Sequence, residues 1–193
     1  MFTAIFAPSR CSLMLRDFSV LVNYYLCAMK LYIVRHGIAA PHGSFGISEE
    51  DRPLTQEGID KMKRAAEGLQ ALGVDPEIVL SSPLPRALQT AEIVIAACKK
   101  TVPLKLLPAL APGGDRSEVY RELAAHASLG SIMLVGHQPS LGEVAGEIAW
   151  GTPDHYVELK KGGACALDLD RIKPLPRGSL VWLVTPSILR QVT

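Results

Sequence analysis

Short, unbroken runs of apolar residues alternate along the chain with longer segments in which apolar residues recur every three or four positions. Unbroken runs are typical of strands buried on both faces of a sheet, whereas the longer period is typical of helices with one buried side. The runs span 31–34, 77–81, 104–107 and 132–135, and the helical segments span 55–73, 84–98, 117–129 and 140–150. This alternation predicts an α/β fold, a three-layer α/β/α arrangement built on a mostly parallel sheet.

Two further apolar runs, 164–169 and 180–184, are joined by a turn rich in proline and glycine. We expect them to form a hairpin-like pair at one edge of the sheet. Local signals also predict helix starts: Thr55 as the capping hydroxyl of the first helix, and a capping box formed by Ser140 and Glu143 at the start of the last.

Three of the predicted strands end in residues that carry chemistry. Arg35 and His36 directly follow the first run, and Gly37 then allows a sharp turn. Arg86 lies in the first turn of the helix after the second strand, and His137 follows the strand 132–135. In an open α/β sheet the carboxyl ends of the strands border one ligand crevice. We therefore expect two imidazoles and two guanidiniums to meet there.

This residue set fits a phosphoryl group better than a metal ion. Guanidinium cations repel a divalent metal, whereas their planar fork matches phosphoryl oxygens. One imidazole can attack phosphorus, and the other, if protonated, can neutralise charge on the transferred group. Taken singly, His36 is better explained as a satisfied strand-end histidine and Arg86 as a solvated first-turn arginine. However, the helix dipole disfavours a cation at a helix N-terminus, which favours an anionic partner for Arg86.

The composition limits the expected partners. With 20 Lys and Arg against 19 Asp and Glu, the formal net charge is +1, which provides no overall field to attract nucleic acid or an anionic membrane. The four cysteines form no Cys-x-x-Cys pair, so neither a disulfide framework nor a zinc site is expected. We therefore expect a cytoplasmic protein that binds no nucleic acid, membrane or metal.

Residues 1–28 differ in composition from the rest of the chain. They are apolar and aromatic, but no uninterrupted apolar run approaches the ~20 residues of a membrane span, and charged residues interrupt the stretch that a signal peptide would need. Because Met29 directly precedes the first predicted strand, we interpret 1–28 as an atypical extension, either upstream of the true start or disordered, with a targeting role as the alternative. The domain that carries these candidate residues is then expected to span 29–193.

Three motifs, in order along the chain, resemble the signatures of the histidine phosphatase superfamily, which has the phosphoglycerate-mutase-like fold. They are Arg35-His36-Gly37, Ser81-Ser82-Pro83-x-x-Arg86-Ala87-x-Gln89-Thr90-Ala91 and Val135-Gly136-His137. The resemblance implies a phosphatase that needs no cofactor. It further implies that His36 becomes phosphorylated while Arg35, Arg86 and His137 hold the phosphoryl oxygens.

Larger members of this superfamily carry a mostly helical insertion before the last histidine, and here only 92–135 fills that gap. Two further segments resemble the compact SixA-type phosphohistidine phosphatases: Asp51-Arg52-Pro53-Leu54-Thr55-x-x-Gly58 and Leu110-x-Pro112-x-Gly114-Asp115. This likeness implies a small, open crevice that admits a side chain displayed on another protein. It also implies a phosphate contact from Arg52, for which a surface salt bridge is an equal alternative.

Larger members also use a carboxylate from the inserted region as a general acid. Asp115 and Glu118 are the nearest candidates here, although Asp115 is better explained as a loop or helix-capping residue. A phosphoramidate leaves as a nitrogen base that can be protonated before cleavage, so we expect P–N substrates to react faster than sugar phosphates. The resulting hypothesis is a metal-independent phosphatase that acts on phosphohistidine in a protein through a phosphohistidine intermediate on His36. The alternatives are a small-molecule phosphomonoesterase and a non-catalytic phospho-binding adaptor.

Overall fold

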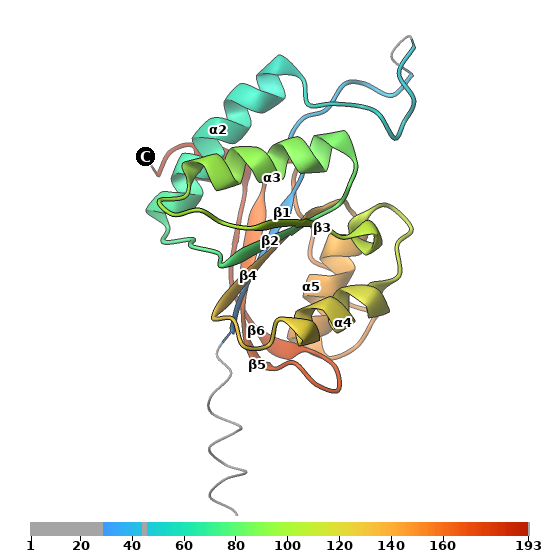
Figure 1. Cartoon of the computed structure of the whole chain (residues 1–193), viewed down its shortest axis with the longest axis vertical. Coiled ribbons are helices and arrows are strands. Elements are labelled where there is room, and N and C mark those ends of the chain that lie inside the picture. Colours follow the sequence, from blue (N-terminus) through green and yellow to red (C-terminus); the bar gives the residue numbers. More distant parts are fainter. Residues whose placement is uncertain (1–28, 44–45, 193) are drawn as a thin grey trace, which may run out of the picture.

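The computed structural model describes residues 29–43 and 46–192, and this part of the chain forms a six-stranded sheet in the order β3-β2-β4-β1-β5-β6 (Figure 1). The first four strands in this order are parallel to their neighbours, whereas β5 runs antiparallel to β1, and β6 antiparallel to β5. The strands are β1 (Met29–Arg35), β2 (Ile78–Ser81), β3 (Leu104–Leu106), β4 (Ser131–Gly136), β5 (Ala164–Arg171) and β6 (Arg177–Val184). The predicted mostly parallel sheet and its edge hairpin are therefore confirmed, while the interpretation of 1–28 lies outside the described residues.

Helices cover both faces of the sheet, as the alternating pattern predicts. They are α2 (Gln56–Ala71), α3 (Pro85–Ala97), α4 (Arg116–Ala125), α5 (Ser140–Trp150) and α6 (Pro186–Leu189), with a short 3₁₀ helix at Pro108–Leu110. The apolar sides of α2, α3 and α6 form one buried cluster with the sheet, and those of α4 and α5 form another on the opposite face. Between α3 and β4 lie only β3, the 3₁₀ helix and α4, so the expected absence of a large insertion is confirmed.

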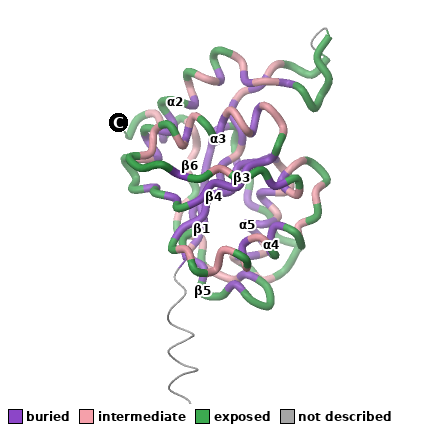
Figure 2. Tube along the Cα trace, viewed as in Figure 1, coloured by how far each residue is buried: buried purple, intermediate pink, exposed green. Residues whose placement is uncertain are grey.

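The two central strands position the chemistry. All six residues of β4 are buried, and β1 is buried over most of its length (Figure 2). Their parallel register pairs Arg35 with Gly136, and β2 pairs Ser81 with Val135. The residues that follow these three strands therefore emerge at the same edge of the sheet, as the carboxyl ends of parallel strands do. Among the described residues, no helix is long and apolar enough to cross a bilayer.

The helix starts agree with the sequence in one case and differ in the other. Thr55 caps α2, because its Oγ1 accepts a hydrogen bond from the Gly58 N–H at 3.0 Å. The predicted capping box of Ser140 and Glu143 is wrong. The chain turns into α5 earlier, so that Ser140 is already the first helical residue, and the Gln138 side-chain oxygen instead accepts the Gly142 N–H at 2.8 Å. The capping group is thus supplied from the loop that carries the last histidine.

Candidate active site

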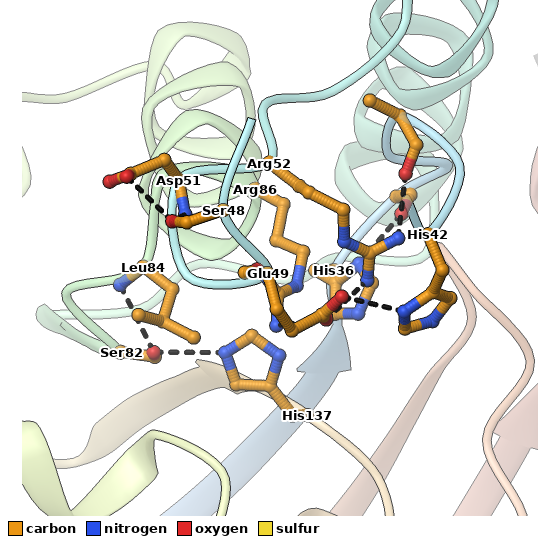
Figure 3. A network of polar contacts seen from close by, with 12 residues as sticks. His36, His42, Ser48, Glu49, Asp51, Arg52, Ser82, Leu84, Arg86 and His137 are labelled. Atoms are coloured by element: carbon orange, nitrogen blue, oxygen red, sulfur yellow. Dashed lines mark hydrogen bonds and ion pairs between the residues drawn. The ribbon is translucent and has the colours of Figure 1, made fainter. Parts of the chain in front are cut away.

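Both predicted histidines lie next to each other at the carboxyl edge of the sheet. The His36 and His137 rings have centroids 5.0 Å apart at an interplanar angle of 51°. Both residues are buried, at 6% and 2% exposure. Two imidazoles with little access to water therefore lie next to each other, and Figure 3 shows them with the surrounding polar contacts.

A backbone carbonyl of the β1–α2 connection fixes the tautomer of the His36 ring. Its Nδ1 lies 2.7 Å from the Gly37 carbonyl oxygen. A carbonyl can only accept, so Nδ1 carries the proton and the lone pair of a neutral ring is on Nε2. The Gly37 N–H donates to Thr90 Oγ1 at 3.0 Å, and that hydroxyl donates to the Arg86 carbonyl at 2.7 Å. Thr90 therefore fixes the loop behind His36 onto α3.

Burial determines the charge of the His36 ring. Desolvation lowers the pKa of His36 to about 3, and the nearby His137, Arg86 and Arg35 act in the same direction, against the hydrogen bond to Gly37. At neutral pH the ring is therefore an uncharged base. A neutral imidazole with a free Nε2 lone pair is the form that can act as a nucleophile.

The turn after β2 holds the His137 ring. Its Nε2 lies 2.9 Å from Ser82 Oγ, which also accepts the Leu84 N–H at 3.3 Å. This contact leaves the second ring nitrogen directed toward His36 (Figure 3). Desolvation, together with the arginines, lowers the pKa of His137 to about 4, so this ring is also neutral in the free protein at neutral pH.

Three arginines surround the histidines. Arg35 donates through Nη1 to the Leu159 carbonyl at 2.7 Å, Arg86 through Nη1 to the Glu49 carbonyl at 2.9 Å, and Arg52 through Nη1 to the Ala40 carbonyl at 2.6 Å. Within the described residues, the buried Nε of each has no hydrogen-bond partner. Burial lowers the pKa of Arg35 and of Arg86. Desolvated guanidiniums that retain free N–H groups form a strong binding site for an oxyanion.

A carboxylate that the sequence analysis did not single out completes the site. Glu49 Oε1 lies 2.6 Å from Arg52 Nη2 and 3.5 Å from Arg86 Nη2, and its Oε2 lies 2.6 Å from His42 Nδ1. The salt bridge considered for Arg52 therefore exists, but its arginine is buried rather than on the surface. In the sequence, Glu49 lies in a polar loop beside Glu50 and Asp51, and no spacing distinguishes it from them.

The two acids considered as proton donors are engaged elsewhere. Asp115 is the N-cap of α4, where it accepts from the Ser117 N–H at 2.8 Å, as its alternative interpretation predicted. Glu118 pairs with Arg121 one turn along the same helix. In residues 29–43 and 46–192, no group of three or more His, Cys, Asp or Glu side chains is arranged to hold a metal ion.

Comparison of the chain with known proteins identifies the family to which it is similar. Residues 31–112 match the model of the histidine phosphatase superfamily (branch 1). The chain is 43% identical over 165 residues to an uncharacterized protein of Picosynechococcus sp., covering 83% of this chain and 99% of that protein. It is 30% identical over 165 residues to phosphohistidine phosphatase SixA of Escherichia coli, covering 84% of this chain and 97% of SixA.

The similarity extends to three dimensions. The structure of the protein histidine phosphatase SixA complexed with tungstate superposes with a TM-score of 0.73 at 30% identity, covering 83% of this chain and 99% of that one. Coverage of 97% of SixA at 30% identity, together with the family match over the first two motifs, assigns the chain to a family. The chain therefore belongs to the histidine phosphatase superfamily and is a phosphatase of that superfamily.

Proposed function

We propose that this protein is a phosphohistidine phosphatase that acts on phosphohistidine displayed on another protein, and that His36 carries the phosphoryl group in a covalent intermediate. The observation that carries the proposal is the state of His36. Its Nδ1–H donates to Gly37, its lowered pKa keeps it neutral, and among the described residues its Nε2 has no hydrogen-bond partner beside the buried arginines. The 30% identity to SixA over almost its full length supports the substrate class.

In the first step, His36 Nε2 attacks phosphorus while the P–N bond to the substrate imidazole breaks. The electron pair of that bond goes to the leaving nitrogen, and the imidazole leaves as a neutral base because its other ring nitrogen has taken up a proton from solvent before cleavage. Arg35, Arg86 and Arg52 bind the phosphoryl oxygens and stabilise the charge that they carry in the transition state. The incoming dianion also favours protonation of His137, whose second nitrogen faces it, so that His137 can donate to a phosphoryl oxygen.

In the second step, a water molecule attacks the phosphorus of phosphorylated His36. The P–N bond to Nε2 breaks, its electron pair returns to His36 as the ring lone pair, and the product leaves as inorganic phosphate. The hydrogen bond from Nδ1 to Gly37 keeps the ring in the same orientation through both steps. Thr90 maintains that orientation by holding the Gly37 N–H.

Two features favour a P–N substrate over an alkyl phosphate. Asp115 and Glu118, the acids considered as donors to an alkoxide, are engaged with Ser117 and Arg121 on α4. A protonated imidazole needs no such acid, because it leaves as a neutral base.

We also propose that the reaction is independent of metal, since the groups that would hold the phosphoryl oxygens are guanidiniums, which supply the positive charge that a metal would otherwise bring.

Chemical trapping tests the proposal. A phosphohistidine peptide labelled on phosphorus should transfer an acid-labile label to the protein, and His36→Ala should abolish both label and turnover, whereas a variant of the exposed His155 should retain them. Turnover should persist in EDTA, and kcat/KM on the peptide should exceed that on 3-phosphoglycerate. Equal efficiency on the two substrates would favour a small-molecule phosphomonoesterase. Peptide binding without label or turnover would favour an adaptor.

A further inference from the structure

Glu49 is the carboxylate that pairs with Arg52 and Arg86, two of the arginines proposed to bind the phosphoryl group. It lies on the connection between β1 and α2, and Figure 3 shows its side chain between Arg52 and the two histidine rings. Its carboxylate is 50% exposed, whereas the Arg52 and Arg86 side chains that it pairs with are only 7% and 4% exposed. Two buried cations thus share one half-exposed carboxylate.

The contacts of Glu49 overlap with those that a phosphoryl group requires. Arg86 Nη1 is bonded to the Glu49 carbonyl at 2.9 Å and its Nη2 lies 3.5 Å from the Glu49 carboxylate, so both terminal nitrogens of this guanidinium face the same residue. Arg52 Nη2 is likewise bonded to this carboxylate, at 2.6 Å. A phosphoryl oxygen that takes the Arg52 N–H bonded to Glu49, or approaches Arg86 Nη2 from the same side, therefore competes with this carboxylate.

The carboxylate is ionised when the site is empty. Partial desolvation alone would raise its pKa, but the hydrogen bond from Arg52 and the positive charges around it hold the pKa of Glu49 below its usual value. Once displaced, the side chain remains tethered to the β1–α2 connection. It therefore stays near Arg52 and Arg86, where its half-exposed side chain can face solvent.

We propose that Glu49 determines the charge specificity of this site, an inference that rests on the phosphatase activity proposed above. Its carboxylate competes with the phosphoryl group for Arg52 and Arg86 and then borders the leaving group. A leaving group that carries negative charge is repelled, whereas one that carries positive charge, as a phosphorylated imidazolium does, is attracted. This preference would separate phosphohistidine from phosphate esters that carry a free carboxylate at the binding step.

The size of the effect follows from Coulomb's law. For unit charges about 7 Å apart in a water-like dielectric, the interaction changes an affinity by about threefold. Between a cationic and an anionic leaving group the two contributions combine to about sevenfold. Releasing the arginines from an exposed carboxylate should in addition tighten binding of a simple oxyanion by about three- to tenfold.

The same loop offers a matched control. Glu50 is exposed and adjacent in sequence, and in the described part of the chain no ion pair or hydrogen bond joins its side chain to the site. Glu49→Gln and Glu50→Gln remove the same charge from the same segment. Only the first removes the carboxylate that contacts the arginines, so any effect of net charge alone appears equally in both variants.

The experiment measures binding, so that it does not depend on turnover. In a His36→Ala background, calorimetry gives the dissociation constants of tungstate and of phenyl phosphates that carry a para-carboxylate or a para-aminomethyl group. Glu49→Gln should reduce the preference for the cationic over the anionic phosphate by about sevenfold and tighten tungstate binding, with Glu50→Gln close to the parent. Comparing ratios between variants cancels the intrinsic differences between the two phosphates.

Three outcomes would overturn the inference: an unchanged ratio in Glu49→Gln, unchanged or weaker tungstate binding in that variant, or an equal shift of the ratio in Glu50→Gln. Circular dichroism and thermal melting establish that each variant is folded. Failure of the proposed function appears separately, as absence of phosphohistidine turnover by the wild type. The binding ratio can still shift in that case, because aryl phosphates and tungstate probe the oxyanion site itself.

Discussion

The burial of His36 should make the stability of this protein fall steeply as the pH drops below neutrality. In the folded protein the pKa of His36 is lowered to about 3, from its ordinary 6.5. In the unfolded chain the ring is about 24% protonated at pH 7 and about 97% protonated at pH 5, whereas in the folded protein it is about 1% protonated at pH 5. The unfolded state therefore binds more protons in this window, so stability is highest above pH 6.5 and is lost as the pH falls toward the folded-state pKa.

The size of this loss follows by integrating proton uptake between the two pH values. For His36 it amounts to about 2 kcal/mol of unfolding free energy between pH 7 and pH 5. His137, whose pKa is lowered to about 4, contributes a similar amount. Replacing His36 with Asn removes one of the two groups. The pH-dependent loss in the variant should therefore be smaller than in the wild type by about 2 kcal/mol, whatever the absolute stability of the variant.

Urea unfolding at pH 7 and pH 5 measures this difference directly, with the unfolding free energy extrapolated to water at each pH. His155→Asn provides the matched control, because His155 is exposed in the folded protein. A smaller loss in His36→Asn than in His155→Asn ties the effect to the buried ring. If His36→Asn also loses as much stability as the wild type between the two pH values, the folded-state ring is not held neutral and the argument for a neutral nucleophile fails.

Two further substitutions test how the loop behind His36 is positioned. Thr90→Val removes the acceptor of the buried Gly37 N–H, which should cost about 1–3 kcal/mol of stability and lower kcat by about tenfold with little change in KM, as measured by thermal melting and steady-state kinetics. Gly58→Ala would place a Cβ 2.0 Å from the Ile38 carbonyl oxygen, so urea unfolding should show a loss of about 1–3 kcal/mol and calorimetry weaker tungstate binding. Wild-type values in either variant would show that the corresponding contact does not position the loop.

Local sequence patterns predicted the fold and most residues of the candidate site. The apolar runs predicted β1, β2 and β4, because strands buried on both faces leave no polar positions. The residues that follow those strands were found in the sequence for the same reason, since a polar residue at the end of a buried run stands out. Asp115 was likewise predicted as a helix cap from its local context, and it caps α4.

The failures occurred where distant segments meet. Ser140 and Glu143 have the spacing of a capping box, but the turn that follows His137 starts the helix earlier and Gln138 supplies the cap. Arg52 and Glu49 form an ordinary i, i+3 pair in the sequence. Their importance depends on Arg86, which lies 37 residues beyond Glu49 and directs its guanidinium at the same carboxylate.

The sequence by itself determined which residues of this protein are candidates for phosphoryl chemistry, because the identity of a side chain and its place at the end of a strand are local properties. Only the tertiary structure decided the charge and proton state of those residues. Desolvation and the distances between charges depend on every segment packed around the site, and these make both imidazoles neutral and hold Glu49 against Arg52 and Arg86.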